Sequence, residues 1–85
     1  MIDSAEIESR VIELVRRHLR TRQEITLATR FREDLGADSL DLVEMIFDVE
    51  QAFAIEVPDG EAVKLRTVAD AVDYVAKVLA CAVSR

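Results

Sequence analysis

The chain is poor in the residues that build most catalytic, metal-binding and disulfide-bonded proteins. Its 85 residues include one Cys, one His, one Pro, two Gly and no Trp. The single Cys81 excludes an internal disulfide and is interpreted as an incidental thiol, and one Cys with one His cannot make a structural zinc site. Aromatic residues make up only 5% of the chain, so Val, Leu, Ile and Ala have to fill the core. No apolar run is long enough to cross a membrane.

The size of the chain and its first residues limit the organisation further. Eighty-five residues are enough for one small domain, which we place over 1–85, and a hydrophobic content of 51% argues against disorder. The N-terminal sequence Met-Ile-Asp-Ser-Ala-Glu contains neither a basic cluster nor an apolar stretch. We therefore expect no signal peptide and a cytoplasmic location.

Charge is distributed in three blocks. Residues 33–63 hold ten acidic side chains and no Lys or Arg, whereas 1–32 and 64–85 each carry a net charge of +2, which leaves the total at −6. The acidic block attracts basic partners over roughly a Debye length, about 8–10 Å at physiological salt. It repels phosphate backbones and anionic lipid surfaces, so we expect neither nucleic-acid binding nor stable membrane insertion.

Hydrophobic periodicity predicts four helices and no strand. Their expected ranges are about 4–20, 39–53, 59–64 and 67–82. Ser4 is predicted to cap the first helix and Asp38 the second, and Thr67-Val-Ala-Asp70 is a capping-box pattern before the last. The expected fold is an all-α, small four-helix bundle with three main helices and one short helix.

A long loop is expected over 21–37, between the first two helices, because that segment has no clean period. Gly36 is expected to adopt a backbone angle that other residues would find costly. Loops of this length are unusual in compact domains and are often functional. The apolar residues spaced to hold the loop against the core are Ile25, Leu27, Phe31 and Leu35.

The second helix presents two different faces. At about 100° per residue, its core stripe comprises Leu42, Met45, Ile46, Val49, Ala52 and Phe53. Leu40 and Phe47 fall on the opposite side, beside the carboxylates of Asp41, Glu44 and Asp48. Single exposed apolar residues are common, but two beside an acidic ridge favour a docking surface.

Ser39 is the strongest candidate for chemistry. It starts the second helix, where free backbone N–H groups and partial positive charge favour an attached phosphate. His18 is the only His and is expected near the core stripe of the first helix, so a catalytic triad is not supported. Modification of Ser39 by another enzyme is the natural interpretation. The alternative is a serine that only starts the helix.

The segment Phe31-Arg-Glu-Asp-Leu-Gly-Ala-Asp-Ser-Leu-Asp41 resembles the attachment-site motif of acyl carrier proteins, and the resemblance covers roughly residues 5–80. It implies that Ser39 carries 4′-phosphopantetheine, whose thiol holds acyl groups as thioesters. The protein would then be a non-catalytic, monomeric carrier that a phosphopantetheinyl transferase modifies. Its partners would be acyl-loading, synthase and acyl-transfer enzymes of fatty-acid or polyketide biosynthesis that have basic docking patches.

The same resemblance assigns roles to the residues around Ser39. Asp38 and Leu40 match its flanking residues. The acidic and apolar positions that contact partner enzymes correspond to Asp41, Glu44, Phe47 and Asp48. The residues that could line an acyl cavity are Ile46, Val49, Phe53, Val68, Val72 and Val75, for each of which ordinary core packing is the alternative.

Other functions have to be weighed against what these residues offer. A carrier of aminoacyl or peptidyl groups uses the same fold and serine, although the Gly-Gly-His-Ser type of motif is absent. A helical adaptor could use the acidic patch without any prosthetic group. A calcium loop starting at Asp34 fails, because its sixth position would be Ser39 instead of Gly and its twelfth Met45 instead of Glu. No metal site is predicted.

Overall fold

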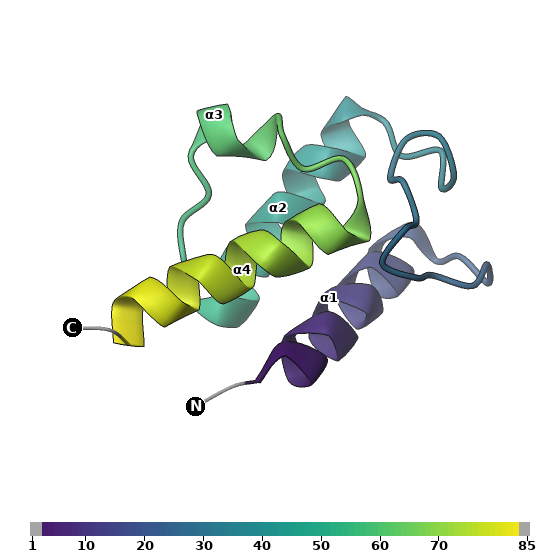
Figure 1. Ribbon diagram of the computed structural model, residues 1–85. Helices are drawn as coiled ribbons and strands as arrows, with labels where there is room; N and C mark the ends of the chain where they lie inside the picture. The colour runs from purple at the N-terminus through teal and green to yellow at the C-terminus, as the bar shows by residue number, and fades with distance from the viewer. Residues whose placement is uncertain (1–2, 84–85) are drawn as a thin grey trace.

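The structure is a computed structural model that describes residues 3–83 and the side chains of residues 3–80, so the Cys81 side chain lies outside the described residues. Its four helices are α1 (Ser4–Leu19), α2 (Ser39–Phe53), α3 (Asp59–Ala62) and α4 (Val68–Val83). Figure 1 shows α2 and α4 running in the direction opposite to α1. Over residues 3–83 the only β-type pairing is an isolated bridge between Arg30 and Thr67. The expected small all-α bundle is confirmed.

The N-terminal cap was predicted correctly for α4 but not for α1. The prediction that Ser4 caps α1 is wrong, because the Asp3 carboxylate accepts the backbone N–H of Glu6 at 2.9 Å and Ser4 is already helical. At α4 the capping box is confirmed. The Thr67 hydroxyl accepts the N–H of Asp70 at 3.1 Å, and the Asp70 carboxylate accepts the N–H of Thr67 at 3.2 Å.

Helix α3 is shorter than expected. It ends at Ala62, whereas the sequence predicted helix to residue 64. The N–H groups of Lys64 and Leu65 bond to carbonyls three residues back, at 3.0 and 3.1 Å. That spacing belongs to a tight turn and not to an α-helix. The segment after α3 therefore turns back early toward the start of α4.

The core lies between the three long helices. Helix α1 packs against both α2 and α4. Val11, Val68 and Val75 are almost completely buried, one from α1 and two from α4, as the aliphatic composition predicted. Among the described residues, no helix has both the length and the apolar character needed to span a bilayer.

The loop between α1 and α2 is held by its side chains and by its backbone. Ile25 and Phe31 are buried and Leu35 is half-buried, as predicted. The prediction for Leu27 is wrong, because its side chain is 39% exposed. Its carbonyl instead accepts the N–H of Ala69 at 2.9 Å. Backbone bonding to the start of α4 therefore anchors this part of the loop, where apolar burial was expected.

Asp34 organises the middle of the loop. Its carboxylate accepts the backbone N–H of Arg30 at 2.8 Å and the Arg30 guanidinium at 3.1 Å. These bonds from Arg30 hold the pKa of the Asp34 carboxyl below its ordinary value. The pKa of Asp34 is lower in the folded protein than in the unfolded chain, so the ionised carboxylate stabilises the fold at pH values above the ordinary carboxyl pKa. This stabilisation of the fold is lost as the pH falls through the pKa of Asp34 in the folded protein.

Replacing Asp34 with Asn should lower the melting temperature at neutral pH by roughly a few degrees, since the charge-assisted bonds to Arg30 are lost. The difference from wild type should shrink as the pH falls below about 4. Thermal denaturation followed by circular dichroism (CD) over a pH series measures this. Glu33→Gln is the matched control, since Glu33 is exposed and makes no hydrogen bond or ion pair within residues 3–80. A deficit that stayed constant down to low pH would contradict the role of the ionised carboxylate.

Candidate functional site

Ser39 is exposed at the first position of α2. The predicted cap is confirmed as a capping box. The Asp38 carboxylate accepts the N–H of Asp41 at 2.8 Å, and the Asp41 carboxylate accepts the N–H of Asp38 at 3.2 Å. The N–H groups of Ser39 and Leu40, in the same first turn, have no partner inside the helix. The serine hydroxyl therefore lies beside backbone donors at the positive end of the helix dipole.

The loop before α2 fixes where the helix starts. Gly36 has a φ of +70°, in the left-handed region that glycine adopts at little cost, as predicted. The next residue, Ala37, is buried and donates its N–H to the carbonyl of Phe31 at 2.9 Å. The buried Phe31 ring and this backbone bond tie the start of α2 to the core, so Ser39 projects from an anchored position.

Arg32 is a neighbour of Ser39 that the sequence did not predict. Its Nη2 donates a hydrogen bond to the Ser39 Oγ at 2.9 Å. The two residues are seven positions apart across an irregular loop, so no helical or strand period connects them. The acidic block begins immediately after Arg32, which places a guanidinium at its edge and directly on the hydroxyl.

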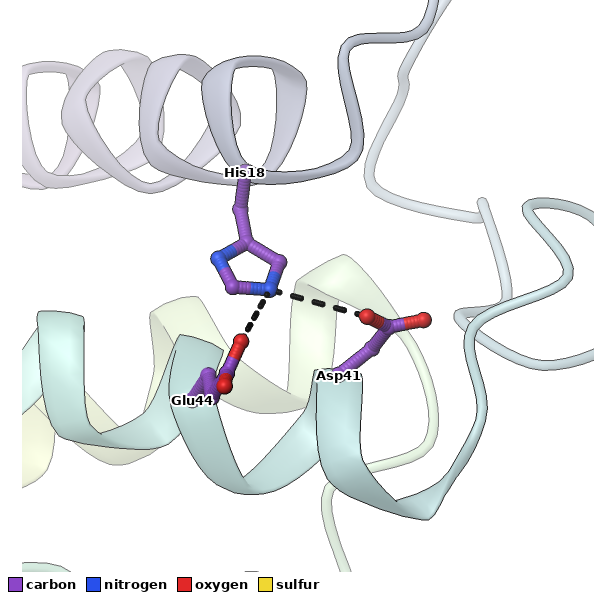
Figure 2. A group of neighbouring side chains, drawn as sticks. All are labelled: His18, Asp41 and Glu44. Carbon is purple, nitrogen blue, oxygen red and sulfur yellow. Dashed lines mark ion pairs between the residues drawn. The ribbon is translucent and has the colours of Figure 1, made fainter.

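The acidic ridge of α2 faces a histidine of α1, as Figure 2 shows for two of its three carboxylates. His18 Nε2 lies 3.3 Å from Glu44 and 3.7 Å from Asp41, and Nδ1 lies 3.5 Å from Asp48. His18 is half-buried, whereas the carboxylates keep much of their surface in solvent. A protonated His18 would form ion pairs with all three. The sequence placed His18 near the core edge but gave no sign of this contact, which joins residues more than twenty positions apart.

Three of these groups are near enough to share a cation. The nearest ligand atoms of His18, Asp41 and Glu44 all lie within 4.8 Å of one another. An imidazolium between carboxylates produces the same arrangement without any ion. The geometry therefore assigns no metal.

Apolar side chains lie on the solvent side of α2. Leu40 is 65% exposed and Phe47 is 57% exposed, which confirms the prediction from the helical wheel. Val43, 63% exposed, extends the same surface and was missed. At about 100° per residue it falls between Ser39 and Phe47, so the signal was present in the sequence. Together with the acidic ridge, these residues make a mixed apolar and acidic face.

An open groove begins at Ser39. It has a volume of about 540 Å³ and runs between α2 and the segment around α3, with Val43, Ile46 and Val63 among its apolar lining. Arg32 and Arg66 line it too. A slender polar chain attached at Ser39 could lie in this groove.

A second, smaller cavity lies inside the bundle. It has a volume of about 50 Å³, and the structure places Ile46, Val49 and Val75 around it. The other predicted acyl-cavity residues pack in the core away from its lining: Phe53, Val68 and Val72. A space of this size holds a few water molecules, so a long acyl chain would fit only if the helices moved apart.

The residues around Ser39 fit a phosphate-linked prosthetic group. The hydroxyl is accessible, backbone N–H groups and the Arg32 guanidinium lie beside it, and a groove leads away from it. Cationic and N–H donors at a helix start are the groups that bind phosphate oxygens.

Comparison with known proteins agrees with this geometry. The family model described as a phosphopantetheine attachment site matches residues 9–75. An acyl carrier protein of Porphyromonas gingivalis is 43% identical over 76 residues, which cover 88% of this chain and 97% of the relative. Another from Rubrobacter xylanophilus is 62% identical over 52 residues, 61% of this chain and 64% of the relative.

A solved structure gives the same answer for the fold. It comes from Mycobacterium tuberculosis, is assigned provisionally as an acyl carrier protein, and superposes with a TM-score of 0.79 at 34% identity. The match covers 82% of this chain and 95% of the other. The helical fold shared with this structure and the family model that matches residues 9–75 lead to the same conclusion. The chain belongs to the acyl carrier protein family, whose prosthetic group is 4′-phosphopantetheine.

Proposed function

We propose that this protein carries acyl intermediates as thioesters on a 4′-phosphopantetheine arm attached to Ser39. The observation that supports this most directly is the exposed Ser39 hydroxyl at the start of α2, within the matched attachment domain. Asp38 and Leu40 flank the serine, and the Asp38 capping box keeps the helix start in place. The protein itself is the carrier, and catalysis belongs to the enzymes it visits.

Attachment is a phosphoryl-group transfer in which the chain supplies only the nucleophile. A phosphopantetheinyl transferase with Mg²⁺ directs the Ser39 Oγ to the phosphorus of coenzyme A that bears the pantetheine. The new Oγ–P bond forms, the bond to the adenosine bisphosphate breaks, and the hydroxyl proton leaves. The product is a phosphodiester with one negative charge and a free thiol at the far end.

Partner enzymes bind the mixed face of α2. Basic side chains of the transferase and of acyl-loading, synthase and acyl-transfer enzymes meet Asp41, Glu44 and Asp48, while Phe47 and Leu40 contact apolar residues. Steering of this kind acts on the association rate. The protein works as a monomer in the cytoplasm and serves fatty-acid or polyketide biosynthesis.

Acyl chains shelter among the helices when no enzyme is bound. Ile46, Val49 and Val75 would contact the chain first, because they surround the cavity of about 50 Å³. The remaining proposed lining residues belong to the same core cluster outside the cavity lining and would be reached as the cavity widens: Phe53, Val68 and Val72.

The test is incubation of the wild-type protein with a phosphopantetheinyl transferase, coenzyme A and Mg²⁺, followed by intact-mass measurement. A gain of one phosphopantetheinyl group is expected. An unchanged mass with several transferases of broad specificity would overturn the proposal and would favour an adaptor without a prosthetic group.

A further inference from the structure

The surroundings of Ser39 contain a guanidinium that forms no ion pair with any carboxylate of residues 3–80. Arg32 donates to the Ser39 Oγ at 2.9 Å, and within residues 3–80 it forms no ion pair. Arg30, two residues earlier, differs because Asp34 binds it at 3.1 Å. The positive charge of Arg32 is therefore free to bind an anion that appears at Ser39.

Attachment of the arm places an anion at this point. The Ser39 Oγ becomes a phosphate ester oxygen, which is a weaker acceptor than a hydroxyl oxygen. The two non-bridging phosphate oxygens become the strong acceptors next to it. A guanidinium that already reaches the Oγ can reach these oxygens with a small side-chain movement. Two N–H groups of the planar guanidinium can then donate parallel hydrogen bonds to the two phosphate oxygens.

The neighbouring acids increase the need for such a cation. Asp38 and Asp41 form the capping box on either side of Ser39, and Glu33 lines the same groove, so the phosphodiester joins three acidic side chains. The free N–H groups of the first turn of α2 relieve only part of this repulsion. Arg32 is the side chain whose cation already lies in hydrogen-bonding contact with the serine.

The groove offers a path for the arm from the bound phosphate. Arg32 and Ser39 lie in the lining of the 540 Å³ groove, and Val43, Ile46 and Val63 line it too. An arm held at its phosphate by Arg32 can lay its apolar methyl and methylene groups along this lining. Arg66 also lines the groove, and its side chain makes no ion pair within residues 3–80.

We propose that Arg32 is a positioning residue that binds the phosphodiester of the arm on Ser39 and holds the base of the arm at the mouth of the groove. The inference rests on the proposed attachment at Ser39. It assigns a role to a residue outside the helix that bears the attachment site.

The test is ³¹P nuclear magnetic resonance of the arm-bearing protein as wild type, Arg32→Gln, Arg32→Lys and Arg16→Gln. The resonance of the unfolded wild type in urea gives the position of a free phosphodiester. In the folded wild type the resonance should be displaced from it, and in Arg32→Gln it should move back most of the way. The resonance of Arg32→Lys should fall between those of wild type and Arg32→Gln, because Lys keeps the positive charge but lacks the planar guanidinium. Arg16→Gln, an exposed change on α1, should coincide with wild type.

Salt provides a second readout on the same samples. Raising the ionic strength to about 1 M, where the Debye length is about 3 Å, should move the wild-type resonance toward that of Arg32→Gln. CD spectra establish that each variant is folded. Coincident resonances for folded wild type and Arg32→Gln would overturn the role of Arg32 while leaving attachment at Ser39 intact. An absent phosphopantetheinyl mass would overturn both.

Discussion

Ser39→Ala will gain no phosphopantetheine from any transferase that modifies the wild type. The loss should be complete, because the hydroxyl oxygen is itself the atom that bonds to phosphorus. The variant should remain folded, since Asp38 caps α2 and Ser39 is exposed. Substitutions at such surface positions usually change stability by less than about 0.5 kcal/mol. Intact mass and a CD spectrum of the same sample give the two results.

The matched control is Ser9→Ala, an exposed serine on α1. It should be modified at the wild-type rate. Full modification of Ser39→Ala would show that the arm is attached elsewhere, and the geometry around α2 would then have no bearing on the function.

Reversing Glu44 and Asp48 to Lys should slow both arm attachment and acyl loading by about tenfold or more at low salt. The two carboxylates belong to the block that attracts basic enzymes, and charge reversal turns attraction into repulsion. The effect should appear in kcat/KM measured by mass spectrometry under single-turnover conditions. It should shrink as salt rises, because exposed charges are screened within a few ångströms at about 1 M.

Two controls separate steering from folding. Glu13→Lys with Glu24→Lys gives the same change of net charge at exposed positions outside α2, and it should slow loading much less. His18→Asn removes the α1 partner of the ridge and keeps every acid, and it should not slow loading. Equal rates for the Glu44 and Asp48 variant and the wild type at low salt would contradict the docking face.

Local patterns predicted most of the fold. The capping box at Asp38, the core stripe of α2 and the exposure of Leu40 and Phe47 depend on residues a few positions apart, where spacing determines which side chains meet. The wrong prediction that Ser4 caps α1 also has a local cause, because the neighbouring Asp3 is an equally good N-cap residue. Leu27 was misplaced because an irregular loop has no period by which to assign its side chains.

The tertiary neighbours of the site, His18 and Arg32, could not be predicted in this way. His18 meets Asp41, Glu44 and Asp48 only because α1 packs beside α2, and Arg32 reaches Ser39 only because the loop folds back before Gly36. Both contacts depend on tertiary placement. They also add to the picture of the acidic block, since an imidazole lies on its ridge and a guanidinium lies at its serine.

The most direct measurement is tandem mass spectrometry of the protein purified from the cells that make it. Trypsin should release residues 33–64 as one peptide, because Lys and Arg are absent from 33–63, and Ser39 is the sole hydroxyl-bearing residue in it. The account predicts that this peptide carries phosphopantetheine on Ser39 and that a fraction bears an acyl group that neutral hydroxylamine removes. A peptide found only unmodified, from cells actively making lipids or polyketides, would contradict it.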